Sequence, residues 1–294
     1  MLKQRSPVAG TRRWHGTFKW LFLLALLCSL LPSAQAAETR VLQMGVFPYL
    51  STRALLDLYE PVRLYLAQEM GRPVNLFTAS GFKAYAVRTQ RSDFDILITP
   101  PHFARLAQRE AGYLPLAMYT RELRGIVVVP MLASIRNLQD LQGKRIATPT
   151  RLALVSMVGR KMLRDNGLSA ELGLQIQSTS SHYNAVLALQ RGEVDAAITE
   201  NSALAQMPAE LRSGVRIVAQ TSAMPHVMYL VHPRLGLETI EHLKAALLKF
   251  PETAVGRKFL QDSGSEGLRL TREADLKVME PYSQELKRLL SSEP

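Results

Sequence analysis

Short strand-like runs alternate with longer stretches of helical spacing along most of the chain. Val41–Phe47 is rich in β-forming residues, and the polar break after it supplies caps for a helix over Arg53–Met70, whose apolar positions recur every three or four residues. Pro61 predicts a kink in this helix and Gly71 predicts its end. Further strands are predicted over Val74–Thr78, Phe94–Ile98, Gly125–Met131, Leu174–Gln177, Asp195–Thr199, Val215–Ala219 and Val227–Val231.

Helical patterns fill most of the intervals between these strands. Ile135–Ala147 predicts a short helix, a glycine stop and a strand. The other predicted helices cover Gly81–Gln90, a segment that opens at Pro100-Pro101, Leu152–Asn166, Glu238–Phe250, Pro251–Gln261 and Asp275–Leu290. Strands that alternate with helices imply an α/β fold, in which a mostly parallel sheet is covered on both faces.

One unit of the chain recurs about 100 positions later. Gln190–Thr199 matches Gln90–Thr99 with Gln, Arg, Asp, Ile and Thr in register, and the loops before the two helices also match, with one residue of slippage. Any two strand–helix units share some of this rhythm, so a chance match is the alternative. A true repeat would bring two helix N-termini and two strand ends to sheet edges of the kind where ligands bind, facing each other across a cleft.

Two segments are expected to carry the chain between two lobes. Gly125–Met131 is the most strand-like run of the sequence, and Gln220–Pro225 is the expected return. We therefore predict a first lobe from residues 37–125 and 225–294, and a second lobe from residues 126–224. Crossings of this kind act as hinges.

The first 36 residues have the composition of a secretory signal peptide. Five basic residues lie before the uncharged apolar run Trp20–Leu31, which is followed by an A-x-A site ending at Ala36. The run is shorter than the ~20 residues of a membrane span, although an uncleaved anchor is the alternative. Cleavage after Ala36 would export a chain without cysteine, since Cys28 lies in the leader, so the mature protein must depend on its core rather than on disulfides.

The charge of the chain gives little support for a nucleic-acid partner. The formal charge of +11 falls to +6 when the five basic residues of the leader are removed. The remaining basic residues are scattered among acidic neighbours instead of forming a basic stripe. A weakly positive surface still favours anionic ligands.

Several segments, in a fixed order, resemble a known family. They are Gly45-x-x-Pro48, Tyr59-Glu60-Pro61 to Leu66 with Gly71, Phe94-Asp95-Ile96, Leu138–Ala147, Ser181-His182 with Ala185–Leu189, and Gly192–Ala197. In their order and spacing they resemble the periplasmic solute-binding proteins of phosphate, phosphite and phosphonate ABC transporters, the PhnD-like family. The resemblance implies a two-lobed type II periplasmic-binding-protein fold with mixed sheets flanked by helices and a ligand cleft between the lobes.

The chain departs from this family at positions that would hold the ligand. The family's Ser-Thr-Ser-Gly cluster before the second-lobe helix is replaced here by Arg151-Leu152-Ala153-Leu154, and family tyrosines are replaced by Phe82 and Phe103. His182 remains, together with a helix start behind Thr150 and a possible guanidinium fork from Arg151, which suits phosphates and carboxylates. We therefore expect a relative with an altered choice of ligand.

The candidate binding residues are aromatic side chains with a few convergent polar groups, as in most small-ligand clefts. They are Tyr49, Ser80, Phe82, Thr99, His102, Phe103, Thr150, Arg151, His182, Tyr183, Glu200 and His226. The aromatic members lie near predicted helix starts and fit a core role equally well, and Arg151 fits a solvated cap. Glu200 would repel a dianion but would pair with an amine, such as that of an aminoalkylphosphonate.

The resemblance implies a periplasmic, monomeric protein without a cofactor, which captures a small anionic ligand by lobe closure and delivers it to an inner-membrane permease. A sensor module that reports to a membrane signalling protein would have the same sequence features and is the alternative. Three histidines suggest a zinc site, but the sequence has no H-E-x-x-H motif or His-rich tract. The chain also lacks a G-x-S-x-G elbow and a complete phosphate loop, so we expect no enzyme activity.

Overall fold

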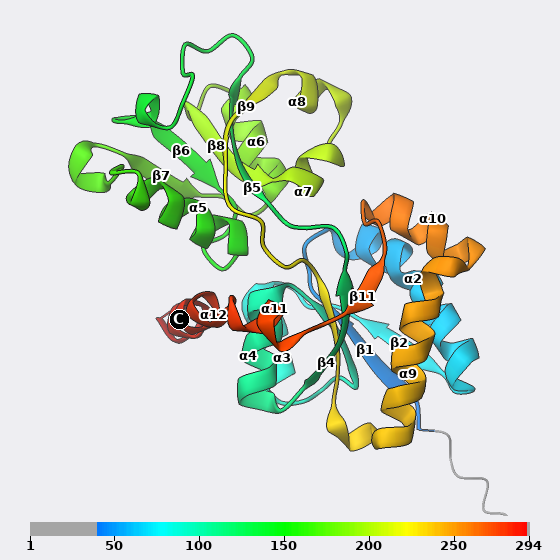
Figure 1. Cartoon of the computed structure of the whole chain (residues 1–294). Helices are drawn as coiled ribbons and strands as arrows, with labels where there is room; N and C mark the ends of the chain where they lie inside the picture. Colours follow the sequence, from blue (N-terminus) through cyan, green and yellow to red (C-terminus); the bar gives the residue numbers. More distant parts are fainter. Residues whose placement is uncertain (1–39, 293–294) are drawn as a thin grey trace, which may run out of the picture. The chain divides into compact units, whose positions relative to one another are not determined.

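The computed structural model describes residues 40–292, and the predicted signal peptide lies outside this range. The strands form two mixed sheets (Figure 1). The first has the order β11-β4-β10-β3-β1-β2, in which β1, β2 and β3 are parallel and the other pairs are antiparallel. Its strands are β1 (Leu42–Val46), β2 (Val74–Phe77), β3 (Ile96–Thr99), β4 (Leu114–Tyr119), β10 (Met228–Val231) and β11 (Leu268–Leu270).

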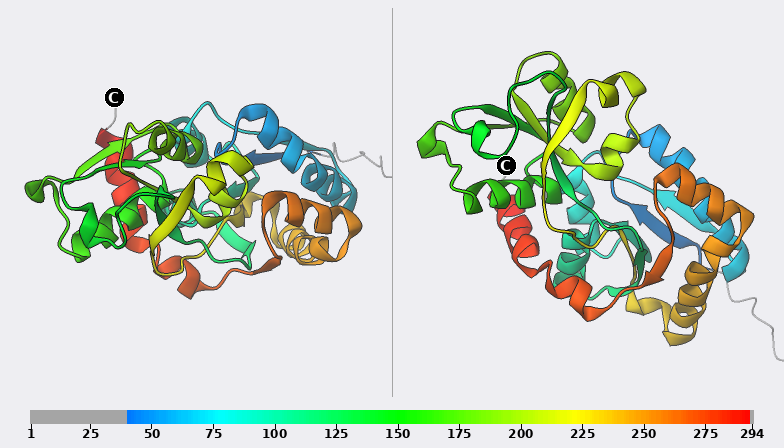
Figure 2. Two further views of the ribbon diagram at one scale, coloured as in Figure 1. Left: turned by 90° about the horizontal axis from the view of Figure 1, so that it is seen from above. Right: turned by 45° about the horizontal axis from the view of Figure 1, so that its top comes forward.

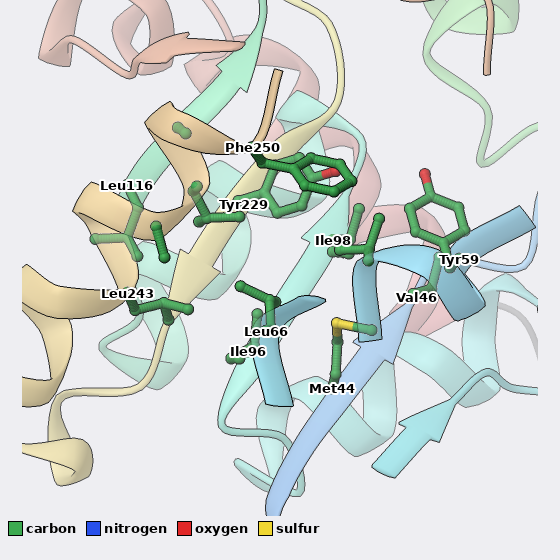
Figure 3. Packing of buried hydrophobic residues seen from close by; sticks show 14 of the residues in the cluster. Met44, Val46, Tyr59, Leu66, Ile96, Ile98, Leu116, Tyr229, Leu243 and Phe250 are labelled. Atoms are coloured by element: carbon green, nitrogen blue, oxygen red, sulfur yellow. The ribbon is translucent and has the colours of Figure 1, made fainter. Parts of the chain in front are cut away.

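Helices cover both faces of this six-stranded sheet. One face is covered by α2 (Thr52–Met70), α9 (Leu237–Lys249) and α10 (Ala254–Ser263), and the other by α3 (Phe82–Gln90), α4 (Pro101–Ala111) and α12 (Glu280–Ser292). Because side chains alternate along a strand, Met44 and Val46 enter the first core, shown in Figure 3, while Gly45 faces the second. A Cβ at Gly45 would lie 2.6 Å from the Phe94 ring, so a close approach of this ring to β1 requires the glycine of the Gly45-x-x-Pro48 segment.

The second sheet has five strands in the order β7-β6-β8-β5-β9. They are β5 (Gly125–Pro130), β6 (Arg145–Thr148), β7 (Gln175–Ser178), β8 (Ala196–Glu200) and β9 (Val215–Gln220). One face packs against α5 (Leu154–Asp165), and the other against α6 (His182–Gln190), α7 (Asn201–Ala205) and α8 (Ala209–Ser213). Helix α5 also contacts the C-terminal segment, because Val155 and Val158 belong to one cluster with Met279 and Tyr282. Helices α5 and α12 are neighbours in Figure 2.

The chain passes from the first sheet to the second between β4 and β5, and returns between β9 and β10. The two connections run side by side, since the backbone N–H of Leu123 donates to the carbonyl of Met224 and the reverse bond has the same length of 2.9 Å. The hydroxyl of Thr221 accepts a further bond from the N–H of Gly125. Each connection is thereby stabilised by the other.

The two similar sequence units adopt the same local structure. Helix α3 corresponds to α6 and strand β3 to β8, at an offset of 100 residues. In each unit an aspartate just before the strand accepts a hydrogen bond from the backbone of the neighbouring strand: Asp95 from Gln43 at 2.8 Å, and Asp195 from Arg145 at 2.9 Å. The aspartate of each unit therefore joins the N-terminal end of its own strand to the neighbouring strand.

Several elements differ from the prediction. Strands β4 and β11 were not predicted, because Pro115 interrupts the first, where the ladder shifts register, and the second has only three residues. The short helices α7 and α8 were also missed. The predicted helix Asp275–Leu290 is divided into α11 (Glu273–Lys277) and α12, because Pro281 has no N–H to donate to the carbonyl of Lys277 in a continuous helix, whereas it is tolerated in the first turn of α12. Among the described residues, no helix combines the length and apolar character needed to span a bilayer.

Candidate functional site

A cavity of about 490 Å³ lies between the two sheets. Several strands point their carboxyl ends at it, since Phe47, Thr99, Tyr119 and Glu200 lie at the ends of β1, β3, β4 and β8 and line it. This is the edge at which α/β sheets bind ligands. A second, more open recess of about 630 Å³ borders the first and shares Pro48, Phe82, Thr150 and Ser180 with it.

Five helices of nine or more residues begin at the cavity. Ser51 caps α2 and Ser181 caps α6, each by accepting a bond from a backbone N–H three residues later. The starts of α3, α4 and α5 have no side-chain cap. A helix N-terminus carries roughly half a positive charge, so the three uncapped ends together supply about +1.5. None of the described residues that line the cavity is a lysine or an arginine.

Glu200 supplies a negative charge to the same cavity. Its Oε1 accepts hydrogen bonds from Ser202 Oγ and from His226 Nε2, the latter at 3.0 Å. Burial alone would raise the pKa of Glu200, but the His226 imidazole, these two bonds and His182 outweigh it and hold the pKa at about 2. His226 Nδ1 accepts from the N–H of Val227 at 2.8 Å, so Nε2 carries a proton and donates it to Glu200.

Two other histidines line the cavity from its two sides. His182, the first residue of α6, has Nδ1 3.1 Å from the hydroxyl of Thr199, and burial lowers its pKa. His102, in the first turn of α4, donates from Nε2 to the carbonyl of Leu152 at 2.9 Å, and burial lowers its pKa to about 4. Both imidazoles are therefore neutral at pH 7.

A chain of phenols completes one wall. Tyr49 donates to Tyr59 at 3.4 Å, and the hydroxyls of Tyr59 and Tyr119 are 3.2 Å apart. Burial raises the pKa of all three, so they remain uncharged donors and acceptors. The Tyr119 ring packs 5.5 Å from the His226 ring, measured between centroids, and so links this wall to the Glu200 cluster.

Most of the predicted site residues come together in this cavity. Nine of the twelve line it: Tyr49, Phe82, Thr99, His102, Thr150, His182, Tyr183, Glu200 and His226. Ser80 lines the second recess, and Phe103 and Arg151 line neither. Phe103 is buried with its ring centroid 4.8 Å from that of Phe47 and has a core role. Arg151 is exposed because α5 starts at Leu154 rather than at Leu152 as predicted.

Many lining residues were not among the predicted site residues, and three of them belong to the hydrogen-bonded groups described above. Tyr59 is part of the apolar pattern of its helix and of a segment that resembles the family, but it was not predicted for the site. Tyr119 ends a strand that was not predicted, and Ser202 lies in the unpredicted helix α7. Only for Ser202 does the sequence contain a signal, since it follows the strand end at Glu200. In the described range, no group of three His, Cys, Asp or Glu side chains is arranged to hold a metal ion.

Comparison with known proteins agrees with this geometry. Residues 44–276 match the family model described as "ABC transporter, phosphonate, periplasmic substrate-binding protein". No curated protein matches the chain. Among solved structures, PhnD1 of Prochlorococcus marinus in complex with methylphosphonate has 15% identity and a TM-score of 0.75, covering 85% of this chain and 99% of that one.

Two more solved structures have the same fold. A binding protein component of an ABC phosphonate transporter from Pseudomonas aeruginosa has 16% identity and a TM-score of 0.72, with 87% of this chain and 90% of that one covered. The aliphatic sulphonate binding protein SsuA of Escherichia coli has 15% identity and a TM-score of 0.62, with coverage of 85% and 94%. These likenesses confirm the predicted two-lobed fold. The family match extends over most of the chain, which therefore belongs to the periplasmic substrate-binding proteins of phosphonate ABC transporters, a family of transport components and not of enzymes.

Proposed function

We propose that this chain captures an organophosphonate-like anion in the periplasm and delivers it to an inner-membrane ABC permease. The observation that carries the proposal is the convergence of uncapped helix starts on one cavity. Unpaired N–H groups and the positive ends of helix dipoles hold oxyanions without side-chain cations. They replace the Ser-Thr-Ser-Gly cluster that the chain lacks, with Thr150, Ser180 and His182 as further donors.

The charge balance indicates a second group on the ligand. About +1.5 from the helix starts opposes the single charge of Glu200, and the pKa of Glu200 keeps it ionised at neutral pH. A dianion alone would be repelled by Glu200. An ammonium group on the same ligand would pair with it, as in an aminoalkylphosphonate.

The size and lining of the cavity also favour an organic ligand over phosphate or phosphite. A volume of about 490 Å³ lies within the ~300–1,000 Å³ of pockets that hold drug-sized molecules. Apolar side chains from Phe47, Phe82, Leu123, Leu154 and Met207 contribute to its walls. A bare oxyanion would leave most of this surface without contact.

Two hydrogen bonds connect residues assigned to different lobes. Gln206 Nε2 donates to the carbonyl of Ser263 at 2.8 Å, and His102 donates to that of Leu152. Bonds of this kind form only when the lobes approach, so they would stabilise a closed state that the permease recognises. The lobe boundaries at residues 125 and 225, the permease partner and the monomeric state are parts of this proposal.

Calorimetry on the exported protein tests the ligand class. We expect 2-aminoethylphosphonate to bind more tightly than ethylphosphonate, and both to bind more tightly than phosphate or phosphite. Glu200→Gln should reduce the preference for the amine at least tenfold, whereas Glu193→Gln, the same change at an exposed turn, should leave it unchanged. The absence of binding to all four compounds at millimolar concentration would refute anion capture.

Export is tested separately by N-terminal sequencing of the protein from a periplasmic extract. We expect the mature chain to begin at Ala37. A chain that keeps its first residues and sediments with membranes would instead support an uncleaved anchor.

A further inference from the structure

Two buried polar atoms lie at the junction of β3 and α4 without a hydrogen-bond partner in the described part of the chain. They are Thr99 Oγ1 and His102 Nδ1, and both residues line the cavity. Thr99 is 1% exposed and His102 is 0% exposed. A buried polar atom without a partner costs ~1–3 kcal/mol, so native structures rarely leave one without a reason.

The hydrogen bond to Leu152 determines what His102 needs. A carbonyl only accepts, so His102 Nε2 carries the proton and donates it at 2.9 Å. Burial keeps the imidazole neutral, with its pKa lowered to about 4. Nδ1 therefore has a lone pair and no proton, and it can only accept.

The surroundings of His102 supply no donor. Its ring lies edge-on to Phe103 with 4.8 Å between centroids, and Phe103 packs in turn on Phe47. The cavity has no lysine or arginine among its described lining residues that could reach across to Nδ1. Because His102 lines the cavity, a molecule held there can supply the missing donor once the side chains that cover Nδ1 shift slightly.

We propose that His102 Nδ1 accepts a hydrogen bond from an O–H or N–H of the ligand, assisted by the Thr99 hydroxyl, and thereby selects ligands that carry such a donor. The inference rests on the proposed function, since it concerns the same cavity. An acceptor at His102 Nδ1 would distinguish ligands that the helix N-termini alone would bind equally well. A phosphonate monoanion keeps one P–OH, while a sulfonate of equal charge and similar shape has none.

Two ligand pairs, measured by calorimetry at pH 6, test this selection and identify the donor. Methylphosphonate against methanesulfonate isolates the P–OH group. Taurine against ethanesulfonate, compared in the Glu200→Gln background so that the carboxylate does not contribute, isolates an N–H group without P–OH. We expect the chain with His102 in place to prefer the donor-bearing member of at least one pair by about tenfold or more. His102→Phe should reduce this ratio towards one. A role of His102 only in joining the lobes would lower both affinities together and leave the ratio unchanged.

Three further variants control the result. His102→Gln retains an N–H for the Leu152 carbonyl and an acceptor oxygen, so it should keep the fold and much of the preference. Thr99→Val should weaken the preference. Thr89→Val removes a buried hydroxyl that also lacks a partner but lies outside the lining of the cavity, and should leave the ratio unchanged.

Each remaining outcome contradicts a specific statement. Equal affinity within both pairs with His102 in place would overturn the role of His102 as an acceptor, with a buried water as its partner, while anion capture would stand. A preference that survives in His102→Phe would assign the acceptor to another group. The absence of binding to all four compounds would refute the proposed function, and this inference with it.

Discussion

Replacing the carboxylate of Glu200 should remove a measurable part of the acid sensitivity of the fold. The Glu200 side chain is 13% exposed, and its pKa falls from 4.5 to about 2 on folding, because His226 and Ser202 hydrogen-bond to its ionised form. Since the folded pKa is the lower one, the carboxylate stabilises the fold above pH ~4.5, and this contribution is lost as the pH falls towards 2. At 1.36 kcal/mol per unit, the contribution at pH 7 is roughly 3 kcal/mol.

The loss can be followed without reaching pH 2. Between pH 7 and pH 3.5 the linkage relation gives a decrease of about 1 kcal/mol in the free energy of unfolding contributed by Glu200. Urea unfolding of the wild type and of Glu200→Gln, at half-unit pH steps, measures this as a decreasing difference between the two proteins. Glu193→Gln serves as the control for the substitution itself. A difference between wild type and Glu200→Gln that stays constant over this range would refute the assignment of a depressed pKa to Glu200.

Further predictions concern the two repeated units and the core. Ser92 is the one described non-glycine residue with positive φ (58°), so Ser92→Gly should raise the free energy of unfolding by ~0.5–1 kcal/mol in urea titrations. The reciprocal change at the matching position, Gly192→Ser (φ 71°), should lower it by ~1 kcal/mol. Changes of the same sign in the two variants would contradict this prediction. Asp95→Ala should cost roughly 3 kcal/mol by the same measurement, because its fully buried carboxylate pairs with an arginine at 2.7 Å; a loss below 1 kcal/mol would argue against a structural role. Gly45→Ala should lower the melting temperature, at a cost of ~1–3 kcal/mol, because the added methyl group would contact the Phe94 ring. Adding Phe94→Leu to the same chain should restore part of this loss. If the effects of the two substitutions on the free energy of unfolding are strictly additive, the contact is excluded.

The sequence predicts the alternation of strands and helices because the apolar spacing of each element is local. It fails where the local signal is interrupted or short. Strand β4, and with it Tyr119, could not be predicted because Pro115 is unfavourable inside a strand. Here the proline is accommodated by a register shift against the neighbouring strand. Helix α7 has five residues, too few for a periodic pattern, so Ser202 was missed as well.

The site was predictable in part for the same reason. Residues at strand ends and helix starts, such as Thr99, His182 and Glu200, follow from the position of each element in the chain. The position of Arg151 outside the cavity does not follow from the sequence in this way, since it depends on the residue at which the first turn of α5 begins. The bond between His226 and Glu200 is also not visible in the sequence, because it joins residues on either side of the chain crossing.

The absence of lysine and arginine from the described lining of the cavity has a consequence for the environment in which the protein works. The salt concentration of the periplasm follows that of the surrounding medium. The attraction between exposed cations and anions weakens as the salt concentration rises. Peptide dipoles that line a cavity are less accessible to dissolved ions than exposed side chains are. We therefore expect the affinity for an anion to change little between dilute and concentrated salt solutions.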